Sequence, residues 1–295
     1  MISIIASDMD GTLLNNEMVV SDFNADAIRQ AQQQGVHFIV STGRRFSEAQ
    51  PLLAAQGITA PLITLNGAEV YDASGKMLDM VPITNSVARA VFHTLTAQGY
   101  YFEVVGNDGI YSNNKAKRIE QIAHLLTNLN PDTTFKIAVS LASARLELMD
   151  INYVDNYNEL LDDPTKHVMK IIAFSEEGPS KLKPLSDEIL AKHSSLKITS
   201  SSASNIEINN INAQKGIAVE RYANMLNTPM SVVTITTTSQ CSNSLVSATR
   251  WAMPVLKSNN WRATSRIPTS TMAWAKRFSR CLRNNSFRKT EVEDA

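Results

Sequence analysis

Three short apolar runs, each followed by a polar cluster, alternate with helical segments at the start of the chain. The apolar runs cover residues 2–6, 36–40 and 62–65, and amphipathic segments at 22–34 and 47–56 separate them. Strands that are apolar throughout are typical of sheets buried on both faces, and alternation with helices makes such sheets parallel. The sequence therefore predicts an α/β fold with a Rossmann-like parallel-sheet core.

The polar clusters lie at 8–12, 42–44 and 66–67, directly after the three predicted strands. In a parallel sheet the carboxyl ends of neighbouring strands meet at one edge, and ligands bind beyond that edge. We therefore expect the three clusters to form one site.

The sequence changes character after residue 83. Residues 84–190 are predicted to form an inserted α+β cap domain, and residues 1–83 and 191–295 the core. Expected cap elements are helices at 85–98, 115–129 and 180–192 and strands at 101–105, 135–139, 145–149 and 168–174. Further strands are expected at 196–199, 205–208 and 232–235, and a helix at 215–226.

Composition excludes several classes of protein. The 28 Lys and Arg residues balance 28 Asp and Glu residues, which argues against a general nucleic-acid or membrane-surface binder. No apolar run is long enough to span a bilayer, and no secretory leader is recognisable, so we expect a cytoplasmic protein without a membrane partner. Cys241 and Cys281 are too few for a disulfide scaffold.

Asp8 and Asp10 are the residues that most directly suggest chemistry. Because they are two positions apart at a strand exit, they would point the same way in an extended strand. Gly11 and Thr12 let the chain turn and leave backbone N–H groups available to an anion. Two carboxylates in a cleft repel each other unless a cation such as Mg²⁺ offsets their charge. One acid could attack phosphorus while the other transfers a proton, although a capped turn with two exposed acids is the simpler alternative.

Four strings carry a family resemblance: D-M-D-G-T-L-L from Asp8, S-T-G-R from Ser41, L-N-G-A from Leu65, and the pair Lys215-Gly216. Over roughly residues 1–235 the chain resembles the haloacid dehalogenase-like hydrolases, specifically the Cof-type sugar-phosphate phosphatases with a large α/β cap. The resemblance implies Mg²⁺-dependent hydrolysis of a small phosphomonoester, expected to be a sugar phosphate, through an aspartyl-phosphate.

The resemblance also implies roles for individual residues. Asp8 is expected to be the nucleophile and a Mg²⁺ ligand, and Asp10 the general acid/base, with its backbone carbonyl on the metal. Thr42 is expected to bind the transferring phosphoryl group, and Lys215 to balance the charge of the nucleophile and the phosphate. The remaining expected phosphate- or substrate-binding residues are Met9, Gly11, Thr12, Gly43, Arg44, Asn66 and Gly67.

Each of these residues has a structural alternative. Thr42 could be a helix N-cap, Arg44 a surface ion-pair partner, Asn66 part of an Asx-turn, and Lys215 a solvated surface lysine. The histidines lack metal-ligand spacing and are predicted to be structural or surface residues: His37, His93, His124, His167 and His193.

Two other functions use the same scaffold. The chain could be a non-catalytic phosphoester-binding module, or a phosphomutase-type phosphotransferase that returns the phosphoryl group to a sugar. The expected partner in every case is a small phosphorylated metabolite.

Residues 231–290 differ from the rest of the chain. They contain no Asp or Glu, whereas 25 of the 28 acidic residues precede them. In the resemblance, a second acidic cluster that completes the Mg²⁺ site follows the strand at 232–235. Thr236, Thr237, Thr238 and Ser239 stand there instead. Hydroxyls are poor substitutes for anionic Mg²⁺ ligands, so the activity is expected to be impaired.

A shifted reading frame explains this composition. Joining each codon's third base to the first two bases of the next lets residues 239–246 encode PMFELAG, 250–262 MGNASAEVKQLA and 263–278 YVTDSNEHDGVGKAI. All three strings resemble the family's usual ending and lie in one frame. We therefore predict a frame-shifted C-terminal region with weak packing and disorder; a divergent tail is the alternative.

Overall fold

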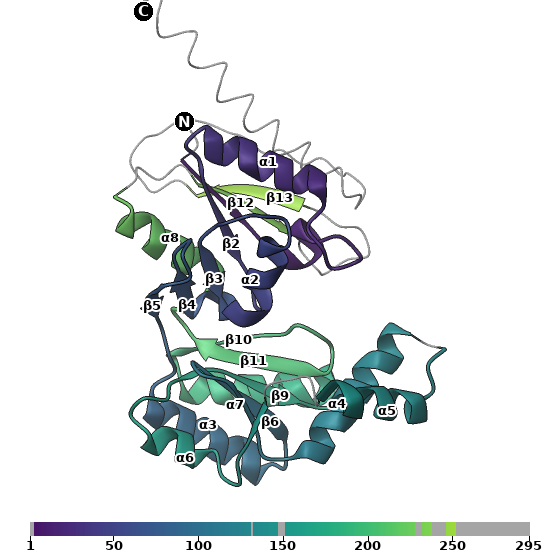
Figure 1. The fold of residues 1–295 in the computed structure, drawn as a ribbon. Coiled ribbons are helices and arrows are strands. Elements are labelled where there is room, and N and C mark those ends of the chain that lie inside the picture. The colour runs from purple at the N-terminus through teal and green to yellow at the C-terminus, as the bar shows by residue number, and fades with distance from the viewer. Residues whose placement is uncertain (1–2, 131, 147–150, 228–231, 238–245, 252–295) are drawn as a thin grey trace, which may run out of the picture. The chain divides into compact units, whose positions relative to one another are not determined.

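A computed structural model of the chain describes residues 3–130, 132–146, 151–227, 232–237 and 246–251. The chain divides into two compact units (Figure 1). The core unit comprises Met1–Met80 and Gln214–Ala295, and the cap unit comprises Val81–Ala213. The core is therefore built from both ends of the chain, and the cap is an insertion.

The core sheet has the strand order β13-β12-β1-β2-β3-β4-β5. Its strands are β1 (Ile4–Ser7), β2 (His37–Ser41), β3 (Leu62–Thr64), β4 (Glu69–Tyr71), β5 (Met77–Met80), β12 (Val232–Thr237) and β13 (Val246–Trp251). β1 pairs in parallel with both β2 and β12, and β2 pairs in parallel with β3. The strands outside these four pair antiparallel. The predicted Rossmann-like parallel sheet is thus confirmed for its centre.

Helices cover both faces of the core sheet: α1 (Asp22–Gln33), α2 (Phe46–Ala54) and α8 (Lys215–Met225). Ile5 of β1 belongs to a buried cluster with Ile28 of α1 and Leu53 of α2. Its neighbour Ile4 belongs to a second cluster, with Tyr222 of α8. Successive side chains of a strand point to opposite faces, so both faces of β1 are buried and its sequence is apolar throughout.

The cap is an α+β unit with the strand order β10-β11-β9-β6-β7-β8. Its strands are β6 (Tyr101–Gly106), β7 (Ile110–Ser112), β8 (Ile151–Tyr153), β9 (Val168–Phe174), β10 (Leu196–Thr199) and β11 (Asn205–Asn210). Its helices are α3 (Asn85–Ala97), α4 (Lys115–Leu129), α5 (Phe135–Leu146), α6 (Asn158–Asp162) and α7 (Pro179–Lys192). One apolar cluster joins α3 and α7 to the strands, with Phe92, Phe102, Ile171 and Leu185 among its members.

The cap extends past the predicted boundary at 190, because β10 and β11 belong to its sheet. β11 pairs antiparallel with β9, where Ile208 lies opposite Ile171. Sequence patterns identify both strands but not their partners, and the partners decide to which unit a strand belongs.

The strands predicted at 135–139 and 145–149 are wrong as far as residue 146, because these residues form α5. The buried residues of α5 are Ala138, Ala142 and Leu146, which repeat every four positions. That spacing places them on one face of a helix.

The C-terminal region contains two described strands. β12 confirms the strand predicted at 232–235 and continues to Thr237. β13 pairs antiparallel with β12, so the prediction of disorder is wrong for residues 246–251. The remaining residues of the proposed frame-shifted region lie outside the described ranges. Among the described residues, no helix is long and apolar enough to cross a membrane.

Candidate active site

The predicted polar clusters follow β1, β2 and β3, which are adjacent and parallel in the core sheet. Asp8 and Asp10 follow β1, Thr42 follows β2, and Asn66 lies in the short helical turn η2 (Leu65–Gly67) after β3. The backbone N–H of Asn66 donates to the carbonyl oxygen of Thr42 at 3.0 Å, which ties two of these loops together. The three clusters therefore share one edge of the sheet.

The loop after β1 is a tight turn, η1 (Met9–Leu13), that begins at Asp8. Gly11 has a φ of 65°, a left-handed conformation that glycine adopts without strain. The Met9 N–H donates to Asp8 Oδ1 at 2.8 Å and so fixes this carboxylate. Of the expected anion donors in the loop, the Met9 N–H thus already binds the Asp8 carboxylate, while Gly11 and Thr12 form the turn itself.

Asp8 forms an ion pair with Lys215, the first residue of α8. Lys215 Nζ lies 2.7 Å from Asp8 Oδ1, and the two side chains are 33% and 16% exposed. The alternative of a solvated surface lysine is therefore wrong. A partly buried pair of this kind is less screened by solvent than a surface pair.

Gly67 helps to place Lys215. Gly67 has a φ of +105°, and a Cβ there would lie 2.6 Å from the carbonyl oxygen of Gln214. Arg221 of α8 also donates from Nη2 to the Gly67 carbonyl oxygen at 2.9 Å. Any side chain at Gly67 would push the start of α8 away from the site. Sequence reasoning missed Arg221 and Gln214, because no motif marks them.

Asp10 pairs with Arg44 from the loop after β2. Arg44 Nε donates to Asp10 Oδ2 at 3.0 Å, and Arg44 Nη2 donates to Oδ1 at 2.6 Å. This two-pronged hydrogen bond raises the pKa of Arg44 above its usual value. Of the two roles considered for Arg44, the structure therefore shows the ion pair, and its partner is a site residue.

Thr42 is fully buried, and its Oγ1 accepts from the backbone N–H of Arg44 at 3.2 Å. The N-cap of α2 is Arg45, so Thr42 is not a helix cap. A Cβ at Gly43 would lie 2.9 Å from Asn66 Oδ1, which means that the Asn66 side chain packs directly over Gly43. Asn66 itself has a left-handed φ of 61°, which asparagine tolerates better than most residues.

The end of β12 lies beside the Asp8 loop. β12 runs parallel to β1, with Ile235 opposite Ser7, so Thr236 and Thr237 follow at the same edge. The potential ligands there are two carboxylates in the loop after β1 and two threonines at the end of β12. Mg²⁺ commonly uses one or two carboxylates and keeps several waters, so Asp8 and Asp10 fit such an ion, with few anionic ligands.

Comparison with known proteins agrees with this geometry. The haloacid dehalogenase-like hydrolase family matches residues 5–235 of the chain. The match ends one residue before Thr236, where the hydroxyl-bearing run begins.

Individual relatives show the same likeness. Phosphatase YwpJ of Bacillus subtilis is 28% identical over 235 residues, which cover 77% of this chain and 80% of the relative. The 5-amino-6-(5-phospho-D-ribitylamino)uracil phosphatase YwtE of the same organism is 28% identical, covering 75% and 76%. A solved haloacid dehalogenase-like hydrolase from B. subtilis is similar with a TM-score of 0.64 and 29% identity, covering 77% and 80%. With a family match over most of its length, the chain belongs to the haloacid dehalogenase-like hydrolases.

Proposed function

We propose that the chain is a Mg²⁺-dependent phosphatase that hydrolyses a small phosphomonoester through an aspartyl-phosphate on Asp8. The observation that carries the proposal is the Asp8 carboxylate, held by the Met9 N–H and by Lys215 at the carboxyl end of a central strand. A carboxylate fixed in this way can attack phosphorus. The phosphatase names of the relatives support the same reaction.

The reaction proceeds in two displacements. An Asp8 carboxylate oxygen attacks phosphorus, the ester P–O bond breaks, and Asp10 gives a proton to the leaving alkoxide. Asp10 then takes a proton from water, whose oxygen attacks phosphorus and displaces the Asp8 carboxylate as inorganic phosphate leaves. Asp10 thus ends each cycle in its original protonation state.

Phosphoryl transfer depends on positioning and on neutralising charge. Lys215 offsets the charge of Asp8 and of the incoming phosphate. Arg44 must release part of the Asp10 carboxylate before Asp10 can exchange a proton with substrate, and its freed N–H groups can then bind phosphate oxygens. Thr42 and the Gly43 N–H lie at the same edge and are proposed to bind the transferring phosphoryl group.

Asp8 and the Asp10 carbonyl are proposed to hold Mg²⁺, which would polarise the phosphoryl oxygens. Without carboxylates after β12, the ion has fewer anionic ligands than the resemblance implies. We therefore propose an impaired phosphatase whose C-terminal region has been altered by a shift of frame. The nucleotide sequence across codons 228–290 tests the shift directly.

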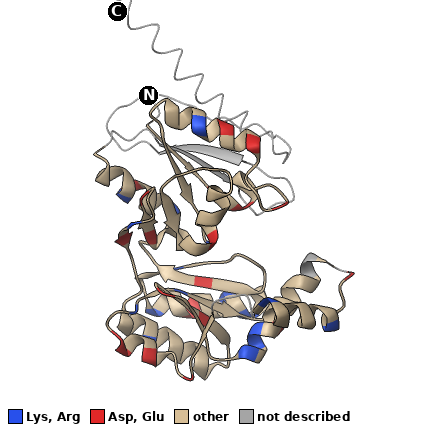
Figure 2. Cartoon of the chain, viewed as in Figure 1, with Lys and Arg blue, Asp and Glu red and all other residues tan. Residues whose placement is uncertain are grey.

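The substrate is proposed to be a small phosphorylated metabolite of the sugar-phosphate class, selected by the cap. Relatives named for 5-amino-6-(5-phospho-D-ribitylamino)uracil support this class. Acidic and basic residues are interspersed in both units (Figure 2). The lack of a nucleic-acid partner remains a prediction. The cytoplasmic location remains a prediction.

Release of inorganic phosphate from an aryl phosphate, measured with Mg²⁺, tests the proposal. We expect release by the wild-type chain and by Asp26→Asn, a change at an exposed aspartate of α1, and none by Asp8→Asn. Binding of the phosphoester without release of phosphate would identify a binding module. A phosphorylated sugar as the product, seen by NMR, would identify a phosphomutase.

An exchange of the cap tests substrate selection. Replacing residues 81–213 with the corresponding cap of YwtE should shift the preference towards 5-amino-6-(5-phospho-D-ribitylamino)uracil, because the core supplies the chemistry but not the selection. Relative kcat/KM values for a panel of phosphomonoesters provide the measurement. An unchanged profile would rule out selection by the cap.

A further inference from the structure

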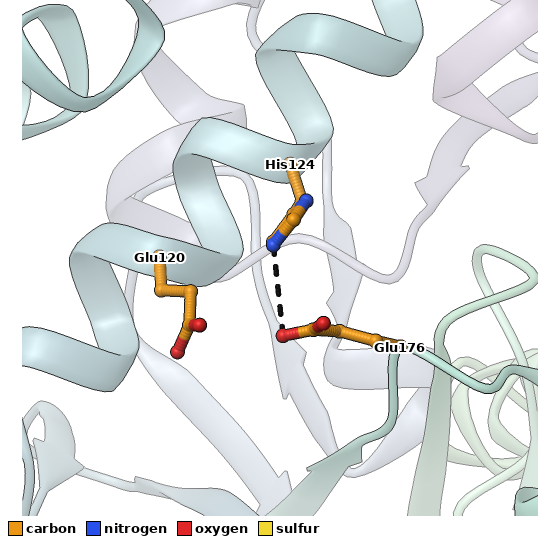
Figure 3. A group of neighbouring side chains, drawn as sticks. All are labelled: Glu120, His124 and Glu176. Atoms are coloured by element: carbon orange, nitrogen blue, oxygen red, sulfur yellow. Dashed lines mark ion pairs between the residues drawn. The ribbon is translucent and has the colours of Figure 1, made fainter. Parts of the chain in front are cut away.

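The cap carries a second group of metal-ligating side chains, Glu120, His124 and Glu176. Glu120 and His124 lie four residues apart on α4, and Glu176 lies in the connection between β9 and α7 (Figure 3). Residues four apart share one face of a helix. One ligand atom from each side chain lies within 4.8 Å of the other two.

His124 and Glu176 already approach each other at a ligand-like separation. His124 Nε2 lies 3.5 Å from Glu176 Oε1, as the dashed line in Figure 3 marks. Bonds of about 2.0–2.2 Å to a tetrahedral ion separate neighbouring ligand atoms by about 3.4 Å. The His124 ring also packs against Phe135, with centroids 4.8 Å apart, so its position is supported from α5. Glu120 offers a carboxylate oxygen within 4.8 Å of both of these ligand atoms.

We propose that Glu120, His124 and Glu176 bind a divalent transition metal, with Zn²⁺ as the reference ion. One imidazole and two carboxylates suit Zn²⁺ and its neighbours in the transition series better than Mg²⁺, which favours oxygen ligands alone. Three protein ligands leave a coordination position for water. All three ligands belong to the cap unit, whereas Asp8 and Asp10 belong to the core unit. The proposal differs from the sequence-based prediction that His124 is a structural or surface residue.

Lys117 is the built-in competitor for this site. Lys117 Nζ lies 2.7 Å from Glu120 Oε2. Glu120 itself lies one turn before His124 on α4. The hydrogen bond to Glu120 chiefly raises the pKa of Lys117, and the negative charge of Glu176 adds to the effect. The Lys117 ammonium group therefore already pairs with the Glu120 carboxylate, and a metal ion bound by Glu120 would compete with it. Removing this charge should strengthen metal binding.

Binding would also connect distant parts of the cap. Glu120 and His124 precede β9, whereas Glu176 follows it. A bound ion would therefore fix α4 to the β9–α7 connection. A ligand that binds only the folded state raises its stability, so Zn²⁺ should raise the thermal midpoint of the full-length chain.

Calorimetric titration of the full-length chain with ZnCl₂ in saturating Mg²⁺ tests the proposal. His124→Gln and Glu176→Gln should each weaken one Zn²⁺-binding event by at least about 10-fold. His93→Gln, a change at an exposed histidine of α3, should leave that event intact. Lys117→Gln should strengthen it. The Co²⁺-loaded chain should show the visible absorption of a tetrahedral site, and His124→Gln should lose it.

Two results would overturn the site. Equal Zn²⁺ affinity and stoichiometry in the wild-type chain, His124→Gln and Glu176→Gln would show that no ion binds there. A Co²⁺ spectrum unchanged by His124→Gln would show that the ion binds elsewhere. Neither measurement depends on phosphatase activity.

Discussion

The carboxyl ends of β1 and β12 lie side by side but differ in chemistry. The β1 loop presents Asp8 and Asp10, each paired with a cation from another loop or helix. β12 pairs with β1 in parallel register, yet it ends in Thr236 and Thr237. Two strands of one sheet thus reach the same edge, one with carboxylates and one without.

This difference shows that different residues determine the path of the backbone and the chemistry of the site. The apolar run that forms β12 is sufficient for pairing with β1, because pairing uses backbone groups and burial. Binding a metal ion requires particular side chains after the strand. A change of composition after Ile235 can therefore alter the site and leave the central sheet in place.

The largest expected effect comes from removing the nucleophile on the β1 side. Asp8→Asn should lower kcat/KM for an aryl phosphate by about 1,000-fold or more, because an amide cannot attack phosphorus effectively. Phosphate release measured beside Asp26→Asn provides the comparison. Turnover like that of the wild-type chain would refute the assignment of Asp8.

Restoring the carboxylates on the β12 side should lower the Mg²⁺ concentration that the enzyme needs. A frame-restored chain should require at least about 10-fold less Mg²⁺ for half-maximal activity, because its ion gains anionic ligands. Phosphate release over a Mg²⁺ titration measures this, and removal of the ion with a chelator should abolish activity in both chains. Equal activity of both chains would show that the missing acids do not matter.

The Asp8–Lys215 pair can be tested by Lys215→Met. Loss of the ammonium should reduce kcat by about 100-fold, since the charge of the nucleophile and phosphate is no longer offset. Lys76→Met, a change at an exposed lysine of the core, serves as the control in steady-state kinetics. If both variants behave alike, Lys215 has no part in the reaction.

The smallest expected effect concerns Arg44. Arg44→Met should lower kcat/KM by about 10-fold. Asp10 would lose its ion-pair partner, and the phosphate would lose a guanidinium group that can donate two hydrogen bonds. Arg44→Lys should recover little, since lysine lacks the fork. Steady-state kcat and KM values of both variants test this prediction. Unchanged values would show that Arg44 is only an ion-pair partner and has no part in the reaction.

The sequence alone determined the central sheet and the position of its site. Apolar runs buried on both faces, separated by helices, predict parallel strands, and polar clusters after them mark the carboxyl edge. These signals are local, because each is contained within a few residues of one element. For the same reason the sequence predicts that Asp8, Thr42 and Asn66 lie at one edge of the sheet, but it does not predict the distances between them.

The tertiary structure alone decided which groups meet. Arg44 takes Asp10 as its partner, and β11 joins the cap sheet by pairing with β9. His124 and Glu176 likewise meet only because α4 packs near the β9–α7 connection. Such contacts depend on how elements pack, and no local pattern of polarity records which distant element will supply the partner.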